Sequence, residues 1–110
     1  MTDKVVVLST CGSSQEALRI ARSLVEERLA ACVNVLPPMR SLYRWQGRVH
    51  DDREQQLVIK TTASRLARLD ARLRQVHPYE LPEFLVLRAG ASDAYAGWLR
   101  DSVRGEDDPG

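Results

Sequence analysis

One short stretch of the chain combines an imidazole, a phenol and two carboxylates around two prolines. Its residues are His77, Pro78, Tyr79, Glu80, Leu81, Pro82 and Glu83. Pro78 lacks a backbone donor and pushes His77 out of the helical region, so a helix that arrives from upstream must end there. Pro82 then stiffens the approach to the apolar run 84–87. We therefore expect a rigid corner between a helix and a buried strand, which holds its polar side chains in fixed directions and suits ligand binding.

A purely structural role is the alternative for this corner. A histidine in the last turn of a helix meets the negative end of the helix dipole favourably, and prolines often follow helix ends. The choice between the two interpretations depends on the rest of the chain.

A second kind of chemistry, that of a thiol enzyme, is offered by the residues around Cys11. A cysteine just after a strand and beside a helix start is expected to have a lowered pKa, with backbone donors ready for an oxyanion. However, the chain has two histidines and neither neighbours Cys11. The loop also lacks the arginine of a cysteine phosphatase. We therefore predict that the protein is not an enzyme.

Length and charge restrict the remaining possibilities. With 110 residues, 44% of them hydrophobic, the chain has room for one domain, which we place at residues 1–104. The acidic segment 105–110 lacks apolar side chains and is predicted to be disordered. Sixteen basic and fifteen acidic residues leave a formal charge of +1. The protein therefore has no large electrostatic field that could hold nucleic acid or a membrane, and neither is expected as a partner.

The N-terminal apolar run 5–8 is too short for a signal peptide or a membrane span. This predicts a cytoplasmic protein. Cys11 and Cys32 could pair, but two thiols in a soluble chain without an export signal are expected to be reduced.

Hydrophobic spacing predicts the helices and strands that hold these residues. A continuous apolar run indicates a buried strand at 4–10. Ser13 and Glu16 form a capping box before a helix with apolar residues at helical spacing. A second helix is expected from Ser64, with this serine as its cap, to the corner, and a third covers 92–103. On the second helix, Arg65, Arg68 and Arg72 are spaced by three and four, which predicts a solvated face.

Between the first two helices, residues 32–62 are predicted to form two long strands that turn near Gln46 and Gly47. At about 3.3 Å per residue, an arm of some fourteen residues reaches roughly 45 Å, whereas a compact chain of this length has a radius of gyration near 13 Å. The hairpin should therefore overhang the domain. Pro37 and Pro38 are expected to mark a kink or bulge in its first arm.

The order of elements predicts an α+β fold, a ferredoxin-like βαββαβ sandwich with a long central hairpin and an extra C-terminal helix. An exposed two-stranded ribbon is marginal alone, and exposed strand edges readily pair with another chain. We therefore expect a closed homo-oligomer.

Several motifs occur in the order and at the distances seen in one known family. They are 30–34 (AACVN), 41–47 (SLYRWQG) with Glu54 and 60–61 (KT) after it, the corner 77–83 (HPYELPE), and 98–99 (WL). From about Val5 to about Leu99 the chain resembles the CutA family of divalent-cation tolerance proteins. This resemblance implies a ferredoxin-like homotrimer in which long strands of one subunit meet those of its neighbours.

The resemblance also implies a role in tolerance to copper or another divalent cation, since some relatives bind copper. The chain has Ser9 and Val76 where a copper-binding relative has a cysteine and a histidine, so only His77 carries over. We expect modest binding of copper with His77 as the chief ligand, completed by a carboxylate such as Glu83 or by a cysteine such as Cys32. For Cys32, a role as a small buried hydrophobe is the alternative.

Four further residues are cleft candidates, because the resemblance places the corner and the base of the hairpin near a cleft between subunits. They are Glu54, Lys60, Tyr79 and Trp45. The alternative for the polar ones is a salt-bridged interface network, and for Trp45 simple packing. If no metal binds, a trimeric signalling or interaction scaffold, which holds a small effector or a protein in these clefts, is the alternative function.

Overall fold

An antiparallel sheet of five strands forms the centre of the protein, which we describe from a computed structural model over residues 3–105. The order of its main strands is β2 (Cys32–Val35), β4 (Arg48–Thr62), β1 (Lys4–Cys11) and β5 (Leu85–Arg88). Strand β1 is central: Val7 lies opposite Ile59 of β4 and Val86 of β5. Of the acidic segment predicted to be disordered, residues 106–110 lie outside the described residues.

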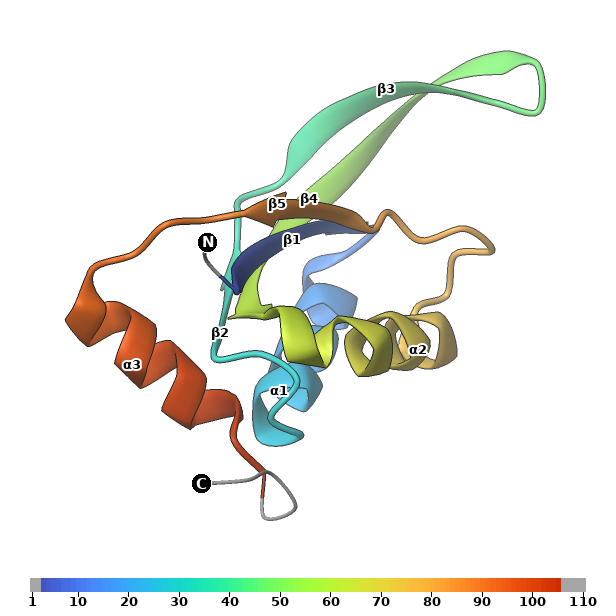
Figure 1. Cartoon of the computed structure of the whole chain (residues 1–110). Coiled ribbons are helices and arrows are strands. Elements are labelled where there is room, and N and C mark those ends of the chain that lie inside the picture. Colours follow the sequence, from blue (N-terminus) through green and yellow to red (C-terminus); the bar gives the residue numbers. More distant parts are fainter. Residues whose placement is uncertain (1–2, 106–110) are drawn as a thin grey trace.

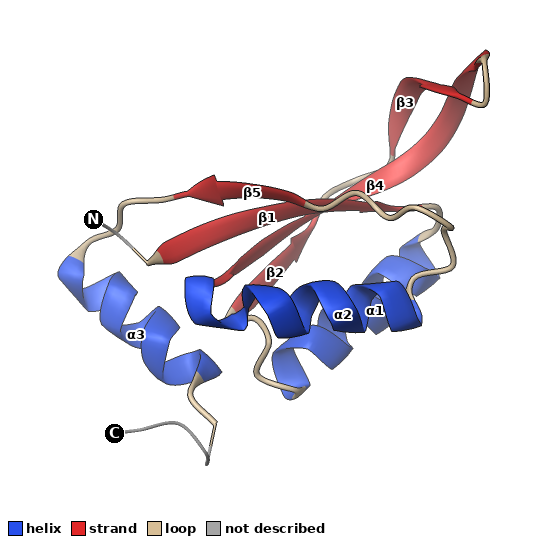
Figure 2. Ribbon diagram, turned by 45° about the vertical axis from the view of Figure 1, so that its right-hand side comes forward, coloured by secondary structure: helices blue, strands red, loops and turns tan. Residues whose placement is uncertain are grey.

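Two helices cover one face of this sheet, α1 (Ser14–Glu26) and α2 (Leu66–Val76) (Figure 2). Alternate residues of β1 and β4, among them Val5, Val7, Leu57 and Ile59, face the helices and are almost fully buried. Helix α1 contributes to the same core Ala17, Ile20 and Leu24, which recur at helical spacing. The result is a mixed α+β fold, and the third α-helix within residues 3–105 is α3 (Asp93–Val103). None of the helices within residues 3–105 is long and apolar enough to cross a membrane.

The predicted start of α1 is confirmed, whereas that of α2 is wrong. The side chain of Ser13 accepts a hydrogen bond of 3.2 Å from the backbone N–H of Glu16, as a capping residue does. Ser64 instead lies within a short 3-10 turn, η1 (Ala63–Arg65), and its hydroxyl is 2.9 Å from that of Thr62. Helix α2 begins only at Leu66, after Arg65 in the capping position, and has no side-chain cap.

The prediction that Arg65 lies on a solvated face is also wrong. This side chain is buried, and its Nε donates a 2.9 Å hydrogen bond to the backbone carbonyl of Val103 at the end of α3. The last carbonyls of a helix have no partner within the helix, so a cation placed there stabilises the helix end. Arg72, four residues beyond the exposed Arg68, pairs with Glu27 after α1, with 2.9 Å between Nε and a carboxylate oxygen.

The predicted overhanging hairpin is confirmed, and Figure 1 shows it projecting from the sheet. Strand β3 (Met39–Trp45) pairs with residues Arg48–Glu54 of β4, and the remaining part of β4 pairs with β1. At the tip, Gln46 and Gly47 both have positive φ angles, of 51° and 76°, which a two-residue type I′ turn requires. The break between β2 and β3 contains Pro37 and Pro38, where a kink was expected. The described residues extend over 48 × 25 × 23 Å.

Candidate functional site

The corner that follows α2 is held against the end of β1 by His77. The backbone of His77 is extended, with φ −82° and ψ 134°, and it ends the helix directly before Pro78, as predicted. The imidazole is buried, and its Nε2 lies 2.6 Å from the carbonyl oxygen of Thr10. Its Nδ1 is 3.1 Å from the backbone N of Tyr79. A ring that carries its hydrogen on Nε2 satisfies both contacts, because it then donates to Thr10 and accepts from Tyr79. Both ring nitrogens are therefore engaged within the chain.

Cys11 lies beside this histidine, with its Sγ 3.8 Å from His77 Nε2. The thiol has no exposed surface. Burial, followed by the nearby carboxylate of Glu16, raises the pKa of Cys11 to about 11. The lowered pKa expected for a thiol enzyme is therefore wrong, because Cys11 is the last residue of β1 and its side chain is buried in the core.

A hydrogen bond joins the corner to the base of the hairpin. The hydroxyl of Tyr79 donates to Oε2 of Glu54 over 2.8 Å. Glu54 is the last residue of β4 that pairs with β3, opposite Met39, and it is only 9% exposed. Burial and this hydrogen bond raise the pKa of Tyr79, so the phenol keeps its proton at neutral pH and remains the donor. Two of the predicted cleft residues therefore touch.

Sequence reasoning missed two residues that support this contact. A Cβ at Gly12 would lie 3.2 Å from the hydroxyl oxygen of Tyr79, so the glycine leaves room for the phenol. Gln56 donates to the carbonyl of Ser9 over 3.2 Å and to Oε2 of Glu83 over 3.3 Å, which links β4 to β1 and to the corner. Nothing near either residue in the sequence indicates these roles, because each depends on a distant segment.

An open cavity of about 820 Å³ lies between strand β3 and the corner. Its lining includes four predicted residues, namely Trp45, Glu54, Tyr79 and Glu83. The structure therefore brings the two carboxylates, the phenol and the indole to one place, next to the buried imidazole.

Cys32 and Lys60 do not belong to this group. They lie opposite each other on β2 and β4. Lys60 is four residues from Gln56, the partner of Glu83, which corresponds to about 13 Å along the strand. A single chain therefore does not bring Cys32 to the corner. Among the described residues 3–105, no group of three or more His, Cys, Asp or Glu side chains could hold a metal ion. The metal-ligand roles of His77, Cys32 and Glu83 stay predictions.

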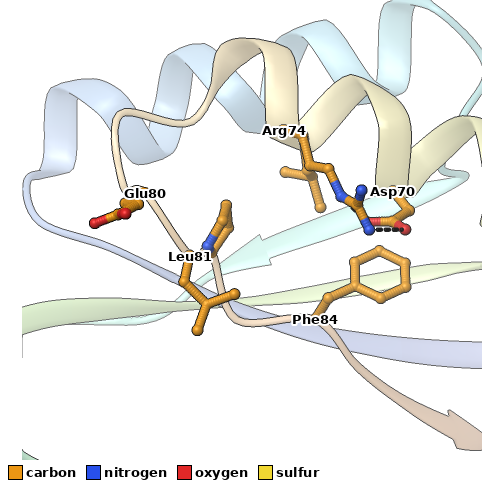
Figure 3. A pocket seen from close by; sticks show the side chains of 7 residues that line it. Asp70, Arg74, Glu80, Leu81 and Phe84 are labelled. Atoms are coloured by element: carbon orange, nitrogen blue, oxygen red, sulfur yellow. Dashed lines mark hydrogen bonds and ion pairs between the residues drawn. The ribbon is translucent and has the colours of Figure 1, made fainter. Parts of the chain in front are cut away.

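A second cavity, of about 590 Å³, lies on the other side of the corner, between it and α2 (Figure 3). Arg74 and Asp70 form an ion pair along one wall, with 3.0 Å between their closest atoms, and the ring of Phe84 lies beside them. Leu81 and Glu80 of the corner line the opposite wall. The two cavities share four lining residues of the corner and the strand entry: Glu80, Leu81, Pro82 and Phe84.

Comparisons of sequence and structure with known proteins identify the family of this chain. The family described as CutA1 divalent ion tolerance protein matches residues 5–102. A relative from Thermus thermophilus, named divalent-cation tolerance protein CutA, is 47% identical over 99 residues, which cover 89% of this chain and 96% of the relative. A protein of the same name from Pectobacterium atrosepticum is 45% identical over 105 residues, which cover 94% and 96% of the two chains. The solved structure of a divalent cation tolerance protein from Thermus thermophilus matches with a TM-score of 0.87 at 46% identity, over 90% of this chain and 97% of that chain. The chain therefore belongs to the CutA1 divalent ion tolerance protein family.

Proposed function

We propose that the protein acts in divalent metal ion tolerance as a cytoplasmic, non-enzymatic homotrimer that binds copper(II) weakly to moderately. Family membership supports the link to divalent cations. The observation that carries the proposal is the hairpin. Within the described residues, β3 pairs only with β4, and the part of β4 opposite it has no other partner. An exposed two-stranded ribbon is marginal alone, so neighbouring copies would supply the missing partners.

Exposed apolar residues outside the hairpin favour the same assembly. Leu85 and Leu87 on the edge strand β5 are 57% and 53% exposed. They lie opposite Leu8 and Val6, on the face of the sheet that α1 and α2 do not cover. A closed ring of three copies would bury this surface. The strand order and the two helices on one face support the ferredoxin-like assignment as part of the proposal.

For copper, His77 is the proposed chief ligand. Within one chain its two ring nitrogens already hold Thr10 and Tyr79, so the ion has to compete with one of these bonds. A hydrogen bond contributes about 1 kcal/mol net, so this competition would weaken copper binding by about fivefold. Cys32 or Glu83 from a neighbouring copy would have to complete the site, because one chain holds no group of three ligands among its described residues.

Two measurements test the proposal. Light scattering should give the mass of three chains, and a stable monomer in dilute buffer would contradict the assembly. Copper(II) titration by calorimetry should show weaker binding to His77→Ala than to the parent, and unchanged binding to His50→Ala, in which the removed ring lies on the hairpin stacked against Tyr43. Equal affinities of parent and His77→Ala would remove His77 from the site. Cell fractionation tests the cytoplasmic location.

A trimeric scaffold that binds a small effector is the second candidate. The cavity of about 820 Å³ between hairpin and corner favours it, since small-molecule sites are concave and usually of roughly 300–1,000 Å³. Absence of any copper binding, together with an intact trimer, would favour this candidate over the first.

A further inference from the structure

Helix α3 has a small apolar core of its own. Two of its eleven residues, Leu99 and Val103, are buried, and they form a cluster with Ala31 that is separate from the core between the sheet and the helices α1 and α2. The helix lies at the end of the sheet that is away from the hairpin (Figures 1 and 2). Residues 89–92, which join it to β5, contain neither helix nor strand. Little buried apolar surface therefore holds α3 in place.

Two arginines from outside α3 hold its C-terminal end. Nη1 of Arg28, two residues after α1, donates a 3.3 Å hydrogen bond to the carbonyl oxygen of Ser102. Nε of Arg65, directly before α2, donates to the next carbonyl oxygen, that of Val103, over 2.9 Å. The last carbonyls of a helix have no partner within the helix and form the negative end of its dipole, so cations suit this position. The end of α3 is therefore fastened to the end of α1 and to the start of α2.

Arg28 occupies a backbone position that favours glycine. Its φ angle is 59°, in the left-handed region. The N–H of Leu29 donates to the carbonyl of Leu24 over 2.9 Å, and the N–H of Arg28 donates to that of Val25 over 3.1 Å. This is the Schellman arrangement that ends many helices, usually with glycine at the left-handed position, because a Cβ makes that conformation costly. The strain at Arg28 indicates that its side chain has a role that glycine could not fill.

We propose that α3 is a hinged strap, which opens from the folded chain as one unit and which Arg28 and Arg65 clamp shut. The helix can move as a unit because its N-terminal cap belongs to the same segment: the side chain of Ser92 accepts a 3.3 Å hydrogen bond from the N–H of Tyr95. Opening would uncover Ala31, which precedes the edge strand β2, while the main core stays packed. Regions with few buried apolar contacts open locally at a lower free energy than the core does.

Native-state hydrogen exchange of the full-length protein, at one fixed protomer concentration, measures this opening. The protection factors of the α3 amides should be at least about tenfold lower than those of the buried β1 amides. Exchange in α3 should also depend only weakly on low concentrations of urea, because local opening exposes little surface. Equal protection and equal urea dependence of α3 and β1 would overturn the proposal, whether the helix is held by its own chain or by a neighbouring copy.

Arg28→Gly separates the clamp from the general stability of the fold. Glycine removes the backbone strain together with the bond to Ser102, so the midpoint of urea unfolding should stay about the same. The protection of α3 should nevertheless fall about fivefold, as expected for the loss of one hydrogen bond.

Two further variants complete this test. Arg28→Ala retains the strain, so it should lower the midpoint of urea unfolding and lower the protection of α3 as much as Arg28→Gly does. Arg68→Ala is the control, because it removes an exposed arginine of α2, and it should leave the protection of α3 unchanged. If α3 keeps its full protection in both Arg28 variants, the clamp does not exist.

Discussion

Removal of the Tyr79 hydroxyl is the sharpest test of how the corner is joined to the hairpin. In Tyr79→Phe the ring that tilts against His77, with 4.6 Å between ring centres, is retained. Only the 2.8 Å hydrogen bond to Glu54 is lost. Hydrogen bonds to charged groups contribute roughly 1.5–3 kcal/mol. Because Tyr79 is partly exposed and water can replace some of the lost donor, we expect the free energy of unfolding to fall by about 1.5–2 kcal/mol.

Urea unfolding at one fixed protomer concentration measures this change, since assembly would make stability depend on concentration. Tyr95→Phe is the matched control, because the hydroxyl of Tyr95 has no hydrogen-bond partner among residues 3–105. Its effect should stay within about 0.5 kcal/mol. A double-mutant cycle with Glu54→Gln should give a coupling energy of at least about 0.5 kcal/mol. If Tyr79→Phe is as mild as the control and the cycle shows no coupling, the joint between corner and hairpin does not exist in solution.

Two further predictions concern the buried ionisable groups. Burial raises the pKa of the Cys11 thiol from its ordinary value of 9.0 to about 11, so the folded protein holds the thiol proton more tightly than the unfolded chain does. The stability that this group contributes is therefore present below pH 9 and lost as the pH rises towards 11. Urea unfolding at a series of pH values should show that the free energy of unfolding falls more steeply over this range for the parent than for Cys11→Ala. Parallel curves for the two proteins would contradict the prediction. Arg65→Ala should lower the free energy of unfolding by about 1–3 kcal/mol, because the carbonyl of Val103 loses its buried donor. Hydrogen exchange should then increase at the end of α3. The control Arg68→Ala, which removes an exposed side chain, should leave the free energy of unfolding and the hydrogen exchange unchanged. Similar effects of the two variants would refute the role of Arg65.

The local signals of the sequence predicted most of the fold. Ser13 caps α1, Pro78 stops α2 at His77, and Gln46 with Gly47 turns the hairpin, as expected. Each of these features is decided by residues within a few positions of one another, through backbone geometry and side-chain caps. The overhang of the hairpin was predicted, but its length was not, because the first arm is broken at Pro37 and Pro38 and only Met39–Trp45 pairs with the projecting part of β4. The failed prediction at Ser64 shows the limit of such local signals, because a short 3-10 turn, Ala63–Arg65, precedes α2 and moves its start to Leu66.

The chemical state of the site was decided by the tertiary structure. The bond from His77 to Thr10 spans 67 positions, and that from Tyr79 to Glu54 spans 25. Both bonds depend on the register of β1 against β4 and on the position of the corner at the end of α2. Neither of these can be predicted from residues that are close in the sequence. The same packing buries Cys11 and Arg65, and so reverses the pKa expected for the first and the exposure expected for the second. The sequence by itself determined which polar groups the corner carries, and the folded chain alone decided which partners they meet, because contacts between distant residues form only when the sheet and helices are packed together.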